Sequence, residues 1–180
     1  MEGSAMSDLA ELDGPHWTFA VEIYACEGVP HACLTLQDQF GIDVIVLMTG
    51  LYSAALGEIL SADDLERMDA AIIDWRQTVV HPLRTMRRQL KSSQFGQPVV
   101  RLRETIKSAE LRSEQIELAM LASQIPHRPS TLAATHDDLR ALIVEIVRLY
   151  APEANPVDIS EIASPIIEAV VARNRETGQP

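Results

Sequence analysis

The chain has 180 residues, 47% of them hydrophobic, which is enough for one domain with an aliphatic core. Its formal net charge is -11, so phosphate backbones should repel it and nucleic-acid binding is not expected. The longest apolar run, at 44–56, is shorter than the about 20 residues of a membrane-spanning helix, and the start lacks a secretory leader. A soluble, cytoplasmic protein without membrane insertion is therefore predicted.

Two helices are predicted near the N-terminus, after a segment at 1–14 that we expect to be disordered or tag-like. The first spans about residues 15–26, because Pro15 suits a first helical turn and apolar residues then recur every three or four positions. The second begins at Pro30 and ends at Gly41, since glycine readily adopts the left-handed conformation that terminates helices.

The next predicted helix, at about 43–57, is apolar on all sides after its capping residue Asp43. Such a helix has to be surrounded by other helices. Gly50 and Ala54 share one face of it, and small residues there let a neighbouring backbone come close. This helix is therefore the predicted centre of the fold.

A proline interrupts the helical pattern that begins at Ser61 and continues to about residue 92. Apolar residues recur every three or four positions from Leu65 to Leu90. Pro82 removes one backbone hydrogen bond and clashes with the carbonyl of Thr78. The pattern predicts a kink or short break near 79–81, followed by a helix at about 82–92.

The longest predicted helix spans about residues 99–125, after a loop at 92–98. The first half of this helix has a narrow apolar seam at Val99, Leu102 and Ile106, which is typical of a coiled coil or of a helix at the edge of a bundle. Helices at about 136–150 and 157–174 then form a C-terminal pair within 126–175. This pair either packs on the core domain, 15–125, or swings from it, and residues 176–180 form a tail.

Together these elements predict an all-α protein, a compact multi-helix bundle around the apolar helix 43–57 with two further C-terminal helices. Three blocks of residues resemble a small proteobacterial family of uncharacterised proteins, domain of unknown function 2390, over about residues 15–120. The first block holds Ile23-Tyr24-Ala25, Gly28-Val29, Ala32-Cys33-Leu34, Leu36-Gln37-Asp38, Gly41 and Asp43-Val44; the second Trp75, Pro82-Leu83-Arg84, Arg87-Arg88 and Leu90-Lys91; the third Lys107, Glu110 and Leu111. Tyr52 departs from this pattern, where a tryptophan is expected. The resemblance implies an all-helical bacterial protein and brings no activity.

The best candidate binding site is a polar stripe across the Pro82 interruption. Its residues are Trp75, Arg76, His81, Arg84 and Arg88. Arginines at a broken helix can bind a small carboxylate or phosphate through paired hydrogen bonds. The alternative is a solvated face whose arginines pair with acidic residues such as Asp69 and Asp74 of the same chain.

Two further groups of residues, one of possible metal ligands and one of carboxylates, do not predict a functional site. His16, Cys26, His31 and Cys33 are close in sequence, but their spacing fits no structural zinc pattern, so a buried Cys33 with solvent-facing histidines is expected. Helix 99–125 carries four carboxylates with basic residues among them, which favours a charged outer face over catalysis. They are Glu104, Glu110, Glu114 and Glu117. No metal and no cofactor are predicted.

These patterns favour a non-catalytic protein over an enzyme, because no nucleophile–base pair or phosphate-binding loop is present. Nine of the fifteen Lys and Arg residues lie within 76–112, so the basic charge is concentrated. The leading hypothesis is a helical interaction module or accessory subunit of a bacterial cytosolic complex, which binds a protein partner or itself. The alternative is a protein or enzyme that binds a small anionic ligand through the Arg/His stripe.

Overall fold

The computed structural model describes residues 11–91, 96–126 and 134–177, and within these ranges it is all-helical. This confirms the predicted fold class. The predictions for residues 1–10, 92–95, 127–133 and 178–180 lie outside the described residues. The elements are α1 (Pro15–Tyr24), α2 (Val29–Phe40), α3 (Val44–Ala55), α4 (Ala62–Trp75), the π-helical turn η1 (Arg76–Val80), α5 (His81–Lys91), α6 (Gln97–Ala122), α7 (His136–Tyr150) and α8 (Pro156–Thr177).

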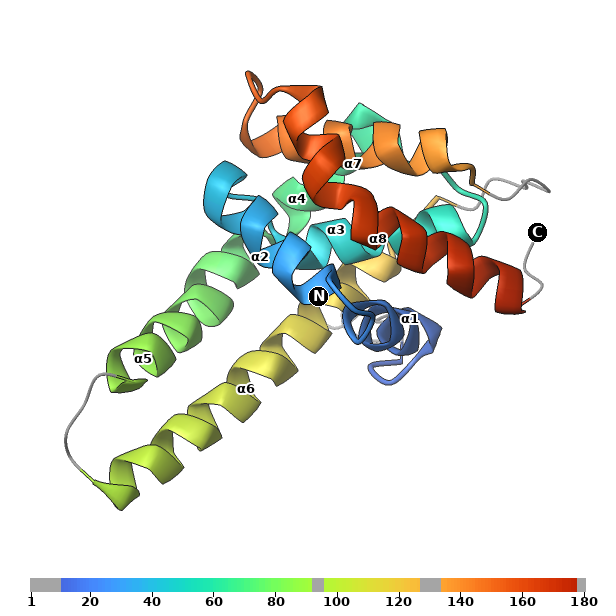
Figure 1. Cartoon of the computed structure of the whole chain (residues 1–180). Helices are drawn as coiled ribbons and strands as arrows, with labels where there is room; N and C mark the ends of the chain where they lie inside the picture. The colour runs from blue at the N-terminus through green and yellow to red at the C-terminus, as the bar shows by residue number, and fades with distance from the viewer. Residues whose placement is uncertain (1–10, 92–95, 127–133, 178–180) are drawn as a thin grey trace, which may run out of the picture.

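Helix α3 forms the centre of the molecule, as predicted. It is packed against α1, α2, α6, α7 and α8, and Figure 1 shows it enclosed by these helices. Nine of its residues are buried. The side chain of Asp43 accepts a hydrogen bond of 2.7 Å from the backbone N–H of Ile45, which satisfies one of the free donors at the helix start.

Gly50, inside α3, allows a neighbouring helix to come close, as the sequence predicts. A Cβ atom added to Gly50 would lie 2.8 Å from Cδ1 of Ile146 on α7, closer than side-chain carbons normally come. Tight packing against α7 thus compensates for the conformational freedom that a glycine loses within a helix.

The C-terminal helices pack on the bundle and share its core. Helix α7 contacts α3 and α4, and α8 lies along α2. Pro165 lies inside α8, which continues from Pro156 to Thr177 without ending there. Its ring packs against Gly28, where an added Cβ atom would lie 3.2 Å from the Cβ of Pro165. The glycine therefore leaves room for the proline-containing helix.

The predicted interruption before Pro82 takes the form of one wide turn. Residues 76–80 are π-helical, and the N–H of His81 donates to the carbonyl of Arg76, five residues back. A wider turn accommodates the missing N–H of Pro82 without ending the helix, so α4, η1 and α5 are continuous. The turn also directs two side chains, Arg76 and Val80, into the interior.

Helices α5 and α6 form a projecting hairpin. We call its outer part, α5 together with residues 97–109 of α6, the arm. Figure 1 shows this pair extending away from the remaining helices. No described residue of the arm is buried, although Met86, Val100 and Leu102 are apolar and 42%, 51% and 51% exposed. Of the predicted seam, Leu102 is thus open to solvent, while Val99 and Ile106 are half-buried.

The arm should open more easily than the helices around α3. The free energy of local opening rises with the apolar area that opening exposes, and the arm buries little. We expect backbone amides of α5 to exchange hydrogen at least about a hundredfold faster than amides of α3 or α7, measured by exchange with mass-spectrometric detection. Equal protection of α5 and α3 would contradict this.

Candidate functional site

The first polar cluster is centred on Arg76, which the wide turn η1 places in the interior at 7% exposure. Its Nε lies 2.5 Å from Oδ2 of Asp43 and 3.3 Å from Oε1 of Glu117, and its Nη2 lies 2.7 Å from Oδ1 of Asp69. The hydroxyl of Tyr150 donates to the same Asp69 oxygen at 2.5 Å. We call these five residues, which come from the α2–α3 junction, α4, η1, α6 and α7, the Arg76 cluster.

The Arg76 cluster contains more acid than base, because one guanidinium faces three carboxylates. Glu117 is fully buried, and its Oε2 has no hydrogen-bond partner among the described residues. Burial raises the pKa of Glu117, and the negative charge of Asp43 raises it further, although Arg76 opposes both effects. Glu117 therefore keeps its proton at pH values at which a solvated glutamate is ionised.

The second cluster joins α5 to α6 through Arg84, Arg87, Glu110 and Glu114. Nη2 of Arg84 lies 2.6 Å from Oε1 of Glu114, and Nη2 of Arg87 donates to Oε1 of Glu110 at 3.0 Å. Arg87 Nε also contacts Glu110, and Arg84 Nε lies 3.3 Å from it. Burial raises the pKa of Glu110, but the two arginines outweigh this effect, so its pKa lies below the ordinary value.

These contacts correct the prediction that the carboxylates of α6 form a charged outer face. Glu110 and Glu117 are buried, and Glu114 is partly buried. Only Glu104 is exposed, where it pairs with Arg103. Helical spacing identified which residues share a face, but the burial of that face depends on α5 folding back along α6.

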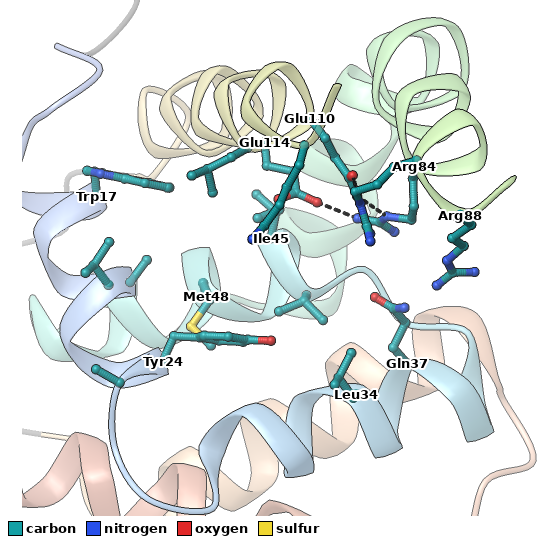
Figure 2. A pocket seen from close by; sticks show the side chains of 17 residues that line it. Trp17, Tyr24, Leu34, Gln37, Ile45, Met48, Arg84, Arg88, Glu110 and Glu114 are labelled. Atoms are coloured by element: carbon teal, nitrogen blue, oxygen red, sulfur yellow. Dashed lines mark hydrogen bonds and ion pairs between the residues drawn. The ribbon is translucent and has the colours of Figure 1, made fainter. Parts of the chain in front are cut away.

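An open cleft of about 650 Å³ lies beside the second cluster, between α1, α2, α3, α5 and α6. Aromatic and aliphatic side chains line one part of it, and four basic side chains line another. Figure 2 shows Trp17 and Tyr24 on the side of α1, with Arg84 and Arg88 across the cleft from them. The lining includes Trp17, Tyr24, Leu34, Gln37, Ile45, Met48, Arg84, Arg87, Arg88, Lys107, Glu110, Leu111 and Glu114.

A smaller side pocket of about 470 Å³ adjoins the cleft, and Gln37, Arg84 and Arg88 line both. Its lining also includes Asp43, Arg76, His81 and Tyr150. Burial and the nearby Arg84 lower the pKa of His81, so this imidazole is neutral at pH 7. The cleft and the side pocket therefore adjoin at side chains that include the exposed residue Arg88.

The structure gathers four of the five predicted site residues around the side pocket: Arg76, His81, Arg84 and Arg88. Trp75 is not among them, because its Nε1 donates to the carbonyl of Ser113 at 3.1 Å. Arg88 has no hydrogen bond or ion pair within the described part of the chain.

Sequence reasoning missed the acidic partners of these arginines and the aromatic wall of the cleft. Asp43 was identified only as a helix cap, although its second oxygen binds Arg76. Trp17 and Tyr24 lie within the predicted helix 15–26, whose apolar spacing did not indicate a cleft. The one signal available was the spacing of Glu110, Glu114 and Glu117, which matches the helical spacing of the arginines.

The cysteines and histidines do not form a metal site within residues 11–91, 96–126 and 134–177, where no suitable group of three ligands occurs. Both thiols are free, and burial raises the pKa of Cys33 to about 12. Cys33 is buried and His31 exposed, as predicted, but His16 is only 3% exposed. The expectation of a solvent-facing His16 is wrong. Its ring packs against the body of the protein, with its centroid 6.2 Å from the centroid of the Tyr52 ring.

None of the described helices is both long and apolar enough to cross a membrane. No curated protein and no solved structure matches this chain. Residues 15–121, more than half of the sequence, match the family described as "Protein of unknown function (DUF2390)". This confirms the resemblance seen in the sequence, and the chain belongs to the DUF2390 family.

Proposed function

We propose that this protein is a non-catalytic interaction module whose arm docks on an acidic surface of a partner protein. The observation that carries the proposal is the arm without buried residues, on which Met86, Val100 and Leu102 remain exposed. Two helices that pair without burying a residue gain little from the hydrophobic effect. A partner that covers these side chains would supply the missing apolar burial.

The charge of the arm supports an acidic partner. The arm contains seven Lys or Arg and one Glu, a net charge of +6, whereas the rest of the chain carries -17. The side chains of Arg88, Lys91 and Lys107 form no ion pair within the described residues. Exposed apolar side chains and unpaired cations on the same projecting pair of helices are features that a protein interface combines, with an apolar centre and a charged rim.

A protein partner fits this arm better than a nucleic acid does. Phosphate backbones would be attracted by the arm but repelled by the -17 charge of the remaining chain. Contacts to phosphates would also leave Met86, Val100 and Leu102 exposed.

We also propose a reducing compartment, such as the bacterial cytosol, as the setting of this module. Cys26 and Cys33 are both free thiols, which is typical of proteins from reducing compartments. The resemblance to a proteobacterial family agrees with a bacterial origin.

Site-specific photo-crosslinking in the producing cell tests the docking proposal. A benzophenone amino acid at Leu102 should give a discrete protein adduct, whereas the same group at Leu56, which is 44% exposed on the body, should not. An adduct of twice the mass identifies a second copy as the partner. Absence of a discrete adduct at Leu102, or an adduct that nuclease removes, would contradict the proposal.

Charge-reversal variants show whether the basic residues guide docking. Lys91→Glu with Arg101→Glu should remove most of the Leu102 adduct. Arg140→Glu with Arg148→Glu changes the net charge equally on α7 and should leave the adduct intact, because these arginines lie outside the arm. Equal loss of the Leu102 adduct in both double variants would show that the basic residues of the arm do not guide docking.

A further inference from the structure

We propose that the cleft beside the base of the arm binds a small amphiphilic organic anion, with an apolar chain or ring and a single carboxylate-like head. The cleft shares Arg88 and Lys107 with the arm, but its apolar wall comes from helices of the body, so the ligand site goes beyond the proposed docking function. The volume of about 650 Å³ lies within the range of about 300–1,000 Å³ that is usual for small-molecule sites.

The apolar part of the ligand is indicated by the wall of the cleft. Trp17, Tyr24, Leu34, Met48 and Leu111 line it from four different helices. Figure 2 shows the rings of Trp17 and Tyr24 directed from α1 toward the space in front of α3. Tyr24, Leu34 and Leu111 are all exposed, so a chain or ring placed there would remove apolar surface from water.

The charge of the ligand follows from the ionisable lining. Arg84 and Arg87 are already paired with Glu110 and Glu114, so these four charges largely cancel. The remaining lining cations, Arg88 and Lys107, have no ion-pair partner within the described residues. The lining therefore carries a net charge of +2 in a chain of net charge -11, which favours an anion locally.

The position of Arg88 places the anionic head. Arg88 and Gln37 line both the cleft and the side pocket, and Figure 2 shows them close to each other. A guanidinium and a side-chain amide both donate hydrogen bonds to a carboxylate. Asp43 also lines the side pocket, where its carboxylate is already paired with Arg76. A monoanionic head at Arg88 with its apolar part toward Trp17 fits this arrangement.

Isothermal titration calorimetry with three small probes tests the ligand class on the full chain. Octanoate has the proposed chemistry, acetate has only its head, and octyltrimethylammonium has its chain with the opposite charge. We expect saturable binding of octanoate, and affinities at least about tenfold weaker for both other probes, because each lacks one of the two favourable contributions. Octanoate that binds no better than either probe would overturn the proposal.

Paired variants test the location. Arg88→Ala should weaken octanoate binding about tenfold, because it removes a charge-assisted hydrogen bond. Lys91→Ala removes the same charge from the same helix outside the cleft and should have no effect. Leu34→Gln should likewise weaken binding more than Leu56→Gln, since Leu56 does not line the cleft. If Arg88→Ala and Lys91→Ala bind octanoate with the same affinity, the ligand lies elsewhere and the assignment is contradicted.

Tryptophan fluorescence gives an independent readout of the same site. The chain has two tryptophans, and Trp17 lines the cleft whereas Trp75 does not. In a Trp75→Phe variant, octanoate should change the remaining emission along the same titration curve that calorimetry gives. Binding without any change in Trp17 emission would argue against this cleft. The arm crosslinks are measured without a small ligand, so failure here and failure of the docking proposal are distinguishable.

Discussion

Replacement of Arg76 by methionine should lower the free energy of unfolding by about 3–5 kcal/mol, because it leaves one buried and two partly buried carboxyl groups without their cation. Among the described residues, Arg76 is the one guanidinium in contact with Asp43, Asp69 and Glu117. Methionine preserves much of the side-chain volume, so the loss reports charge more than packing. Urea unfolding followed by circular dichroism at neutral pH measures this effect.

Two comparisons make the Arg76 prediction specific. Arg148 pairs with Glu145 on the exposed face of α7, and Arg148→Met should cost less than about 1 kcal/mol. Arg76→Lys should have an intermediate effect, because a single ammonium group cannot reproduce the arrangement of guanidinium donors. Equal losses for Arg76→Met and Arg148→Met would show that the buried ion pairs contribute little.

The helices were predictable because their signals are local in sequence. Helix α7 was predicted at about 136–150 and occupies His136–Tyr150, since Thr135 caps its start and apolar residues follow at regular intervals. Central α3 was identified by the apolar residues on all of its faces. Capping residues and apolar periodicity involve residues only a few positions apart, so they can be identified from the sequence alone.

The wide turn before Pro82 was only partly predictable. The sequence shows that Pro82 cannot donate a hydrogen bond, which requires some local change. It does not show whether the helix breaks, kinks or widens, because that choice depends on distant contacts. Arg76 forms ion pairs with Asp43, the residue just before α3, and with Glu117 of α6, and both are compatible with the widened turn. The form of the helix before Pro82 is thus associated with ion pairs to residues far away in the sequence.

The candidate site was predictable on its basic side and not on its acidic or apolar sides. The arginines lie within one segment, so their spacing placed them on one face. Glu110 lies 26 residues after Arg84, and the two meet only because α6 folds back along α5. Trp17, Leu34 and Met48 come from three further helices. A cleft assembled from such separate segments depends on helix packing, which periodicity alone does not specify.

Replacement of Glu117 by glutamine should raise the free energy of unfolding by about 1–3 kcal/mol at neutral pH, because it removes a buried acid from a cluster with excess negative charge. Arg76 would keep its contacts with Asp43 and Asp69, and the amide oxygen can still accept from Arg76 Nε. Glu104→Gln, at an exposed position of the same helix, is the matched control and should change stability little.

The pH dependence of the Glu117→Gln effect provides the sharper test. The pKa of Glu117 is raised in the folded protein, so the folded state holds this proton more tightly than the unfolded chain does. The contribution of Glu117 to the free energy of unfolding is therefore most favourable below about pH 4.3, the pKa of a glutamate in the unfolded chain. This contribution is lost as the pH rises from there through the pKa of Glu117 in the folded protein. Glu110, whose pKa is lowered, contributes with the opposite sign but remains in both proteins. The difference between variant and wild type should thus grow as pH increases above about 4.3 and then level off. A difference that stays constant with pH would show that Glu117 ionises in the folded protein as it does in the unfolded chain.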